Sequence, residues 1–435
     1  LNEMTGIHVQ QTSAISFNSN IRIHGLNGKY TQLLRDGIPL YGGFSSGLGL
    51  LQITPLDLQQ VEIIKGSNST LYGGGAIAGL VNLITKKPTE EPETSLMLNA
   101  TSAGGMDIST FHSSQQNTVG RTVFSSYNRN NAYDPANIGF SAIPEFERWT
   151  FNPRILIDKT HSEFSIGFNA IKENRVGGHM KYIKGKQIDL AYFEKTKTNR
   201  FSTQLEYMTQ NQSANEFVFR NSVSYYRQDF DVPNHSFGGT QLSSFTEAHL
   251  LGSSDSLDWV MGINLWIDSF DDNETVLTSA LDFTSYTYGA FAQGTFYFQN
   301  NWSAETGMRI DSTSDYGNFF LPRIALLYTP DEATSLRIGG GFGYMEPTLF
   351  SSEAEAIQYK GLLPLDVKQL VAEESIGLNV DLNHRLIFDN GATLNFNFLL
   401  FYTKVNDPLR LTEINKEQLA YHQPDDYLHT QGTEL

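Results

Sequence analysis

The glycine run Gly73-Gly74-Gly75, followed by Gly79, is the first candidate for chemistry, because glycine-rich loops can cradle phosphate groups. A nucleotide loop also needs a Gly-Lys-Ser/Thr sequence or an amphipathic helix after it, and neither follows here. The alternative is structural: glycine is required where a backbone turns tightly or passes close to another strand. The sequence favours this structural explanation.

Two pairs of neighbouring charged residues could act as an acid and a base. These pairs are Asp57 with Glu62, and Arg35 with Asp36. No nucleophile or metal-binding motif accompanies either pair, so the sequence lacks the constellation that a catalytic site needs. We therefore expect no catalytic residues and no enzyme.

Histidine and cysteine usage limits the possible metal chemistry. The chain has no cysteine, which removes thiol catalysis, cysteine-based zinc sites and disulfides. Its 10 histidines are scattered, without paired or i, i+4 spacing. His179, in Gly177-Gly178-His179-Met180, could be an axial iron ligand for haem. The alternative, a solvent-exposed loop histidine, fits the scattered spacing better. We expect no bound metal ion and no cofactor.

Charge and composition exclude several classes of protein. The net charge is −17, from 30 Lys+Arg and 47 Asp+Glu in 435 residues, and such a field repels nucleic acids. Aromatic residues are 12% and charged residues only 18%, against a usual charged share of about 25%. No run of ~18 or more apolar residues is present, so a helical membrane span is not expected. The chain begins Leu1-Asn2-Glu3, with no visible signal peptide.

From about Trp149 onward the chain repeats stretches of alternating apolar and polar residues. In one stretch Trp302, Ala304, Met308 and Ile310 share one face, while the other face includes Glu305, Arg309 and Asp311. We count roughly fifteen such segments between Ser95 and Lys404. This pattern predicts either a soluble β-sandwich or propeller, or an outer-membrane β-barrel with lipid on the apolar side.

Four features favour the barrel. The strands approach the ~9–11 residues needed to cross a bilayer. Aromatic residues gather at strand ends, and the polar faces contain Arg, Glu and Asn. Short turns also alternate with longer loops, as in outer-membrane barrels. The long loops are expected at residues 171–198, 233–241, 268–282 and 347–373.

The first ninety residues differ from the rest. Short β-like runs at residues 21–25, 31–36 and 61–65 are separated by Gly, Ser, Asn and Pro. We expect a separate α+β domain over residues 1–90 and a barrel over residues 91–435, with the boundary near Lys86-Lys87-Pro88. Because its strands are charged, the small domain should lie inside the polar lumen.

The N-terminal segment resembles the plug domain of TonB-dependent outer-membrane receptors. The resemblance rests on IRIHGLNGKYTQLLRDGIPLYGG (residues 21–43) and ITPLDLQQVEIIKGSNSTLYGGGAIAGLVNLITKKP (residues 53–88). Weaker matches are ETGMRID (305–311), LPRIALLY (321–328) and GGGFGYMEPTLF (339–350). In the last segment, Met345-Glu346-Pro347 stands where iron-complex receptors of the family usually have Arg- or Lys-Ala-Pro.

The resemblance implies a mainly β protein: a transmembrane antiparallel β-barrel of a 22-stranded family, with an α+β plug in its lumen. Family members also have a TonB box and an earlier plug segment. The sequence is therefore expected to be an internal fragment, lacking the N-terminal TonB box and the last barrel strands. Its sheet is accordingly expected not to close between the strands near Leu96 and Leu394.

The resemblance also implies a function and a set of residues. The function is energy-coupled import, in the outer membrane of a Gram-negative bacterium, of a scarce solute such as an iron–siderophore complex. The alternatives are a haem or cobalamin receptor, or, in another class, a secreted β-rich glycan-binding or adhesin protein. The expected partners are a TonB-type protein, acting through the missing N-terminal segment, outer-membrane lipid and the ferric chelate, but no nucleic acid. Ligand contacts are expected from Asn27, Lys29, Tyr41, Phe44 and Ser45, with His179 as a further candidate, and plug–barrel docking from Arg22, Glu62, Lys65 and Glu305.

Overall fold

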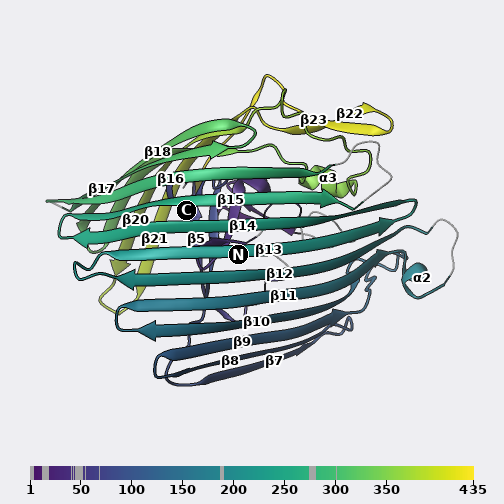
Figure 1. Ribbon diagram of the computed structural model, residues 1–435, viewed down its shortest axis with the longest axis horizontal. Coiled ribbons are helices and arrows are strands. Elements are labelled where there is room, and N and C mark those ends of the chain that lie inside the picture. Colours follow the sequence, from purple (N-terminus) through teal and green to yellow (C-terminus); the bar gives the residue numbers. More distant parts are fainter. Residues whose placement is uncertain are drawn as a thin grey trace.

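A computed structural model describes residues 4–11, 19–40, 42, 44, 52–53, 55–67, 69–186, 191–273, 281–299 and 301–435. Its main feature is a single antiparallel sheet of sixteen strands, which curves around the N-terminal part of the chain (Figure 1). We call these strands the wall and the described residues up to Thr85 the plug. The wall strands are β7 (Glu93–Ala100), β8 (Met106–Gln116), β9 (Val119–Asn130), β10 (Glu145–Lys159), β11 (Ser162–Gly178), β12 (Phe193–Gln210), β13 (Glu216–Val232), β14 (His235–Ser254), β15 (Leu257–Asp272), β16 (Phe283–Phe298), β17 (Trp302–Thr313), β18 (Gly317–Asp331), β19 (Thr334–Met345), β20 (Glu373–Ile387), β21 (Thr393–Asn406) and β24 (Tyr427–Glu434).

The alternating apolar and polar residues of the sequence lie on opposite faces of the wall. On β17, Trp302, Met308 and Ile310 are 43%, 56% and 55% exposed on the outside, whereas Arg309 and Asp311 are buried on the inside. Glu305 also points inward, where it pairs with Arg323 of β18. The predicted facing of this strand is therefore confirmed.

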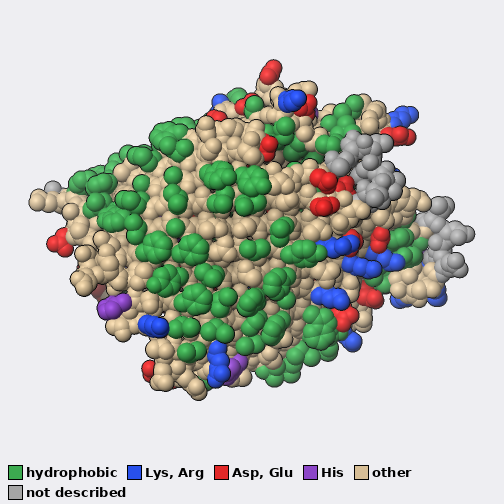
Figure 2. Space-filling model, in the orientation of Figure 1, with side chains coloured by type: hydrophobic (Ala, Val, Ile, Leu, Met, Phe, Trp, Pro, Cys, Tyr) green, Lys and Arg blue, Asp and Glu red, His purple; other side chains and the backbone are tan. Residues whose placement is uncertain are grey.

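The outer face of the wall has an apolar belt. In Figure 2, hydrophobic side chains cover the middle of the strands, and Lys, Arg, Asp and Glu gather near the end that bears the helices α2 (Met180–Ile183) and α3 (Ser352–Ala356). An apolar band of this kind, with charged side chains beyond one end of it, matches the hydrocarbon layer of a membrane. No helix among the described residues is long and apolar enough to cross a membrane.

The two ends of the wall differ in their connections. At one end the turns are short, as at residues 117–118, 160–161 and 332–333. At the other end the connections are long, and they include residues 179–186, 346–372 and 407–426. We call the second end the mouth. The prediction of a long loop at residues 233–241 was wrong, and the loops predicted at 171–198 and 268–282 were too long, because residues 171–178, 193–198 and 268–272 belong to β11, β12 and β15. β13 and β14 are joined by the two residues Pro233 and Asn234, and pairing continues directly beyond them at Val232 and His235.

The plug contains β1 (Ile7–Gln11), β2 (Ser19–Ile23), the 3-10 helix η1 (Gly28–Tyr30), β3 (Thr31–Arg35), β4 (Ile38–Pro39), β5 (Leu58–Lys65), α1 (Ser69–Tyr72) and β6 (Gly79–Thr85). Four of these strands form a sheet in the order β4-β3-β6-β5, in which β3 and β6 run parallel. Its core contains Ile23, Ile77 and Val81, and it also includes Val405 of wall strand β21, which is fully buried. The core of the plug is thus completed by the wall.

The glycine run has the structural role that the sequence favoured. A Cβ on Gly74 would lie 2.2 Å from the ring of Tyr344 in the wall, and one on Gly79 would lie 2.1 Å from the backbone oxygen of Ile64. Gly79 also has a φ of +138°, which L side chains rarely adopt. These glycines allow close backbone approaches between the plug and the wall and within the plug.

The wall has fifteen strands between Glu93 and Asn406, β7 to β21, among the described residues, in agreement with the roughly fifteen predicted. Its outermost strands are β7 and β24, and in the described part of the chain these two do not pair with each other. The expected open sheet is therefore observed. At the mouth, β22 (Arg410–Asn415) and β23 (Gln418–His422) form a separate hairpin.

Candidate functional site

The apex of the plug lies against the mouth through the short helix η1. Asn27 caps this helix by accepting a hydrogen bond from the Lys29 N–H at 3.1 Å, and its amide donates to Ser352 Oγ of α3 at 3.3 Å. Lys29 Nζ and Tyr30 Oη both donate to Glu373 Oε1 of β20, at 3.0 and 3.1 Å. Burial, together with the charge of Glu373, raises the pKa of Tyr30, so its hydroxyl remains a donor. Asn27 and Lys29 therefore connect the plug to the mouth.

Phe44 lies inside an aromatic cluster at the mouth and is only 3% exposed. Its ring centroid is 5.1 Å from that of Phe270 and 5.2 Å from that of Phe350, with the rings tilted or edge-on. Such tilted and edge-on pairs are favourable arrangements for aromatic rings. The aromatic cluster consists of Phe44, Tyr226, Phe230, Phe237, Phe270, Phe350 and Tyr359.

Basic side chains line the wall beside the aromatic cluster. Arg200 of β12 is buried with its guanidinium 4.6 Å from the ring centroid of Tyr226. Arg148 and Arg175 both pair with Glu173, each at 2.6 Å, and all three side chains are buried. A group of two arginines with one carboxylate has a net positive charge, and Arg200 adds to it. This side of the mouth suits an anionic ligand.

The opposite side of the mouth has a protonatable carboxyl group. Glu346, in the segment that departs from the family pattern, accepts a hydrogen bond from Thr287 Oγ1 at 3.2 Å. Burial raises the pKa of Glu346 to about 7, with further contributions from Asp315, Asp311 and Asp268. The two sides of the mouth therefore differ in charge, basic over β10–β12 and acidic near the end of β19.

The remaining predicted ligand residues are placed as follows. Tyr41 and Ser45 lie outside the described residues. His179 caps α2, because its Nδ1 accepts a hydrogen bond from the Lys181 N–H at 3.2 Å, and its ring packs edge-on against Phe140. Both contacts lie in the loops at the ends of β9 and β11. In the structure, His179 therefore makes contacts that stabilise the loop after β11.

The four predicted docking residues differ in their contacts. Lys65 of β5 pairs with Glu434 of wall strand β24 and also donates to the backbone oxygen of Thr5 at 2.6 Å. Glu62 accepts hydrogen bonds from Gln60 and Asn82, which are both in the plug. Glu305 pairs within the wall, as described above. Arg22, half-buried on β2, lies opposite His8 of β1.

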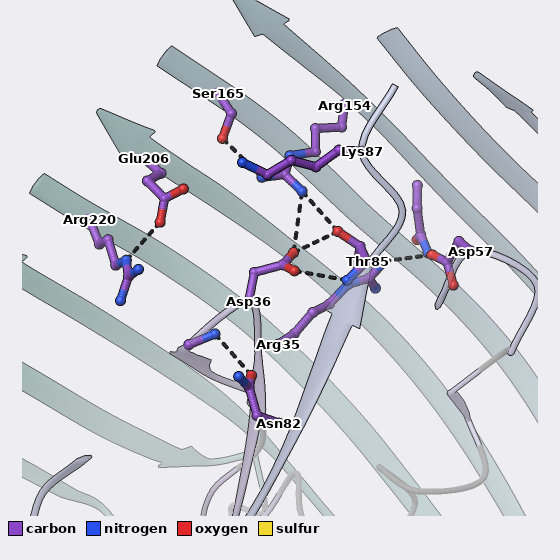
Figure 3. A network of polar contacts seen from close by, with 12 residues as sticks. Arg35, Asp36, Asp57, Asn82, Thr85, Lys87, Arg154, Ser165, Glu206 and Arg220 are labelled. Carbon is purple, nitrogen blue, oxygen red and sulfur yellow. Dashed lines mark hydrogen bonds and ion pairs between the residues drawn. The ribbon is translucent and has the colours of Figure 1, made fainter. Parts of the chain in front are cut away.

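A further docking network, which the sequence did not reveal, joins the plug to β10 and β11 (Figure 3). Asp36 accepts hydrogen bonds from the Thr85 backbone N–H and hydroxyl at 2.9 and 2.8 Å. Arg154 of β10 donates to Thr85 Oγ1 at 2.8 Å, to Asp36 at 3.3 Å and to Ser165 Oγ of β11 at 3.2 Å.

A second group of contacts continues the network at Asp57. This carboxylate pairs with Arg35 at 2.5 Å and accepts a hydrogen bond from Asn152 of β10 at 3.2 Å. Lys87 pairs with Glu163 of β11 at 2.8 Å nearby. We call the contacts centred on Asp36, Asp57 and Thr85 the clamp. One member of each charged pair that was considered and rejected as catalytic, Asp36 and Asp57, thus has a docking role, whereas Glu62 bonds to plug residues.

Comparison with known proteins identifies the family. Residues 1–80 match the TonB-dependent Receptor Plug Domain, and residues 105–435 match the TonB dependent receptor-like beta-barrel. The chain therefore belongs to the TonB-dependent receptors, which are outer-membrane β-barrels of Gram-negative bacteria and are not enzymes. The resemblance found in the sequence is confirmed, and the alternative of a secreted glycan-binding or adhesin protein is excluded.

Solved structures share the fold at low sequence identity. A mutant of the ferric enterobactin receptor PfeA from Pseudomonas aeruginosa, in complex with enterobactin, has a TM-score of 0.78 at 13% identity, over 99% of this chain and 74% of that one. The siderophore receptor PirA from Acinetobacter baumannii has a TM-score of 0.75 at 15% identity, over 98% and 73%. The copper transporter OprC has a TM-score of 0.78 at 14% identity, over 98% and 73%.

Proposed function

We propose that this TonB-dependent receptor imports an iron–siderophore complex that it binds at the mouth. The observation that supports this most directly is the aromatic cluster around Phe44, flanked by the buried Arg200 and the Arg148–Glu173–Arg175 group. Aromatic rings offer flat apolar contacts, and arginines attract the negative charge of a ferric chelate. Because Phe44 belongs to the plug and the other rings to the wall and its loops, ligand binding here would be communicated directly to the plug.

The site supports a chelate better than haem. An Nδ1 that accepts a hydrogen bond places the proton of neutral His179 on Nε2. Ligation of haem iron through Nε2 would require this proton to move and the cap of α2 to break. Basic groups beside aromatic rings suit an anionic aromatic chelate without any such rearrangement.

We further propose that the plug is displaced by a TonB-type protein acting on its N-terminal side, and that the ligand then passes between plug and wall. Asn27, Lys29, Phe44 and Lys65 are the plug residues we assign to the mouth and to docking. Each of the four contacts the wall or its loops through a hydrogen bond, an ion pair or a ring contact.

Growth and binding experiments test the proposal. A strain lacking the receptor should lose growth on at least one ferric siderophore supplied as the only iron source, and the restored gene should recover it. Arg200→Gln should weaken binding of that siderophore at least tenfold, measured by quenching of tryptophan fluorescence. Arg410→Gln is the matched control, because Arg410 lies exposed on the β22–β23 hairpin and pairs with Asp426. Normal growth on every iron source tested would overturn the proposal.

A further inference from the structure

The plug does not contact the wall equally on all sides. Between β5 and α1 of the plug and β16–β21 of the wall lies a cavity of about 720 Å³, which we call the chamber. Small-molecule sites usually have volumes of about 300–1,000 Å³, so the chamber is already in the range of a ligand. Its lining includes Lys65, Tyr72, Glu305, Arg323, Arg337 and Asp381.

On the side of the clamp the plug is tightly packed. Two cavities there, beside Arg35 and Asp57, have volumes of only about 40 and about 10 Å³. A cavity of about 110 Å³ lies between these sides, against β13–β16. The free space between plug and wall therefore grows from the clamp to the chamber.

The plug faces the chamber with an edge strand. β5 is the last strand of the plug sheet and pairs only with β6 among the described residues. Unpaired backbone groups on such an edge need water or another partner, so a hydrated chamber suits this strand. Its apolar side chains are open as well: Val61 is 42% and Ile64 is 37% exposed.

Three charged groups in the chamber wall have partners within the wall. Glu305 pairs with Arg323, and Asp381 accepts hydrogen bonds from Asn383 and Asn397. Movement of β5 away from this wall would leave these pairs intact. Movement at the clamp would instead break three hydrogen bonds between wall and plug, from Arg154 to Asp36 and Thr85 and from Asn152 to Asp57.

Some contacts on the chamber side must nevertheless break. Lys65 would lose Glu434, which also lies 3.2 Å from His24, and Lys29 would lose Glu373. Glu373 and Glu434 are themselves buried, so these breaks also cost free energy, although Glu373 keeps the hydrogen bond from the Leu409 backbone N–H at 2.6 Å.

We propose that the plug opens on the chamber side, with the clamp as its fixed side, and that the chamber is the inner part of the ligand's path. This inference rests on the proposed import function. Residues Ser335, Arg337 and Asn383 of the chamber lie near the short turns at 332–333 and 388–392, so the path leads from the mouth to the end of the wall away from it.

Disulfide tethers test which side must move, and a chain without native cysteine suits them. The pair Ser67→Cys/Gly377→Cys joins the end of β5 to β20, since a Cβ on Gly377 lies 3.2 Å from that of Ser67. The pair Pro88→Cys/Gly120→Cys joins the chain beside the clamp to β9, where the corresponding distance is 3.1 Å. Both distances are close to the usual spacing of about 3.5–4.5 Å in a disulfide.

The probe is the siderophore that supports growth. The oxidised Ser67→Cys/Gly377→Cys variant should bind this siderophore normally, but its uptake rate should fall at least tenfold. Reduction of the disulfide should restore the uptake rate. Oxidised Pro88→Cys/Gly120→Cys should import at the rate of its reduced form. Equal uptake by the oxidised and reduced forms of the first pair would overturn the proposal, as would a block by the second pair.

A labelling experiment tests which side of the plug opens, and it does not require a known ligand. Leu71→Cys lies in the chamber lining, and Leu40→Cys lies beside the clamp. In cells with TonB, a bulky maleimide should label Leu71→Cys at least fivefold faster than in cells without TonB, and Leu40→Cys at the same rate in both. No change at Leu71→Cys, or an equal change at both sites, would refute the opening. If no siderophore supports growth, the ligand assignment fails while this measurement still decides the side.

Discussion

Arg309 shows how a single charged residue is accommodated in the wall. It is 3% exposed, with its Nε 2.7 Å from Asp311 Oδ1, and it donates to Asn264 Oδ1 at 2.9 Å. Asp311 also accepts a hydrogen bond from the Tyr344 hydroxyl. Buried pairs of this kind contribute little net stability, but loss of one partner leaves an uncompensated charge.

Arg309→Met should lower the free energy of unfolding by about 3–5 kcal/mol, because the Asp311 carboxylate then stays buried without its cation. The free energy of unfolding should fall clearly less in the double variant Arg309→Met/Asp311→Asn. Urea unfolding in lipid vesicles measures both. Equal losses in the single and the double variant would show that the buried charge is not the cause.

His24 makes the attachment of the plug sensitive to pH. Its ring stacks on Phe401 of β21 at 3.7 Å, and burial lowers its pKa to about 4, although Glu434 acts in the opposite direction and Lys65 in the same direction. The unfolded chain therefore binds a proton between about pH 6.5 and pH 4 that the folded plug does not. The contribution of neutral His24 to the stability of the folded protein is therefore fully present above pH 6.5 and is lost as the pH falls towards 4.

At roughly 1.4 kcal/mol for each pH unit, stability should fall by about 3 kcal/mol between pH 6.5 and pH 4 through this group. His24→Phe keeps a ring against Phe401 and removes the titration, so the variant should lose this part of the pH dependence. Calorimetric unfolding across this pH range is the measurement. His422→Phe, an exposed position on β23, is the control and should keep the dependence.

At the scale of elements, the aromatic cluster joins the plug to the loop of residues 346–372. Phe350 and Tyr359 come from this loop, and Phe44 lies between them and the wall strands. The loop is also joined to the β22–β23 hairpin, because the Tyr421 hydroxyl donates to the backbone oxygen of Leu349 at 2.9 Å. The plug, the loop and the hairpin are thus packed as one unit over the mouth.

Phe44→Ala should loosen this unit, since removal of a buried phenylalanine ring costs about 3–5 kcal/mol. Amide hydrogen exchange in residues 346–372 should accelerate markedly, while exchange in β10 and β11 stays unchanged. Phe388→Ala, at a half-exposed turn residue, provides the control. Unchanged exchange in the loop would mean that Phe44 does not hold it.

The wall could be predicted from the sequence because its alternation has a period of two residues over most strands. The first part of β14, residues 235–241, was predicted as a loop because its sequence His-Ser-Phe-Gly-Gly-Thr-Gln has no clear alternation. The clamp could not be foreseen for another reason. Asp36 and Arg154 are far apart in the chain, and local patterns contain no information about such a pairing. The same holds for Lys65 and Glu434.

The outer surface of the molecule is in contact with lipid in one part and with water in another. Two side chains with similar exposed fractions can therefore face different solvents. Ile310 of β17 is 55% exposed within the apolar belt, and Ile414 of β22 is 60% exposed on the hairpin at the mouth. In an outer-membrane protein the first residue faces lipid and the second faces water.

Ile310→Arg should therefore reduce the stability of the folded protein in lipid vesicles by about 2–4 kcal/mol if it lies near the midplane. Ile414→Arg should change stability by less than about 0.5 kcal/mol, as expected for an exposed surface position. Equilibrium unfolding from vesicles gives both values. A neutral Ile310→Arg would place this part of β17 outside the hydrocarbon layer.

The contact of Val405 with the plug core has a consequence for the order of folding. Val405 and Ile23 lie almost a whole chain length apart, yet both are fully buried in one core. Contacts between such distant residues form late, because a very long loop must close first. The plug therefore reaches its final packing only after β21 has taken its place in the sheet. During synthesis and export, the plug emerges before β21 but completes its packing only after β21 is in place.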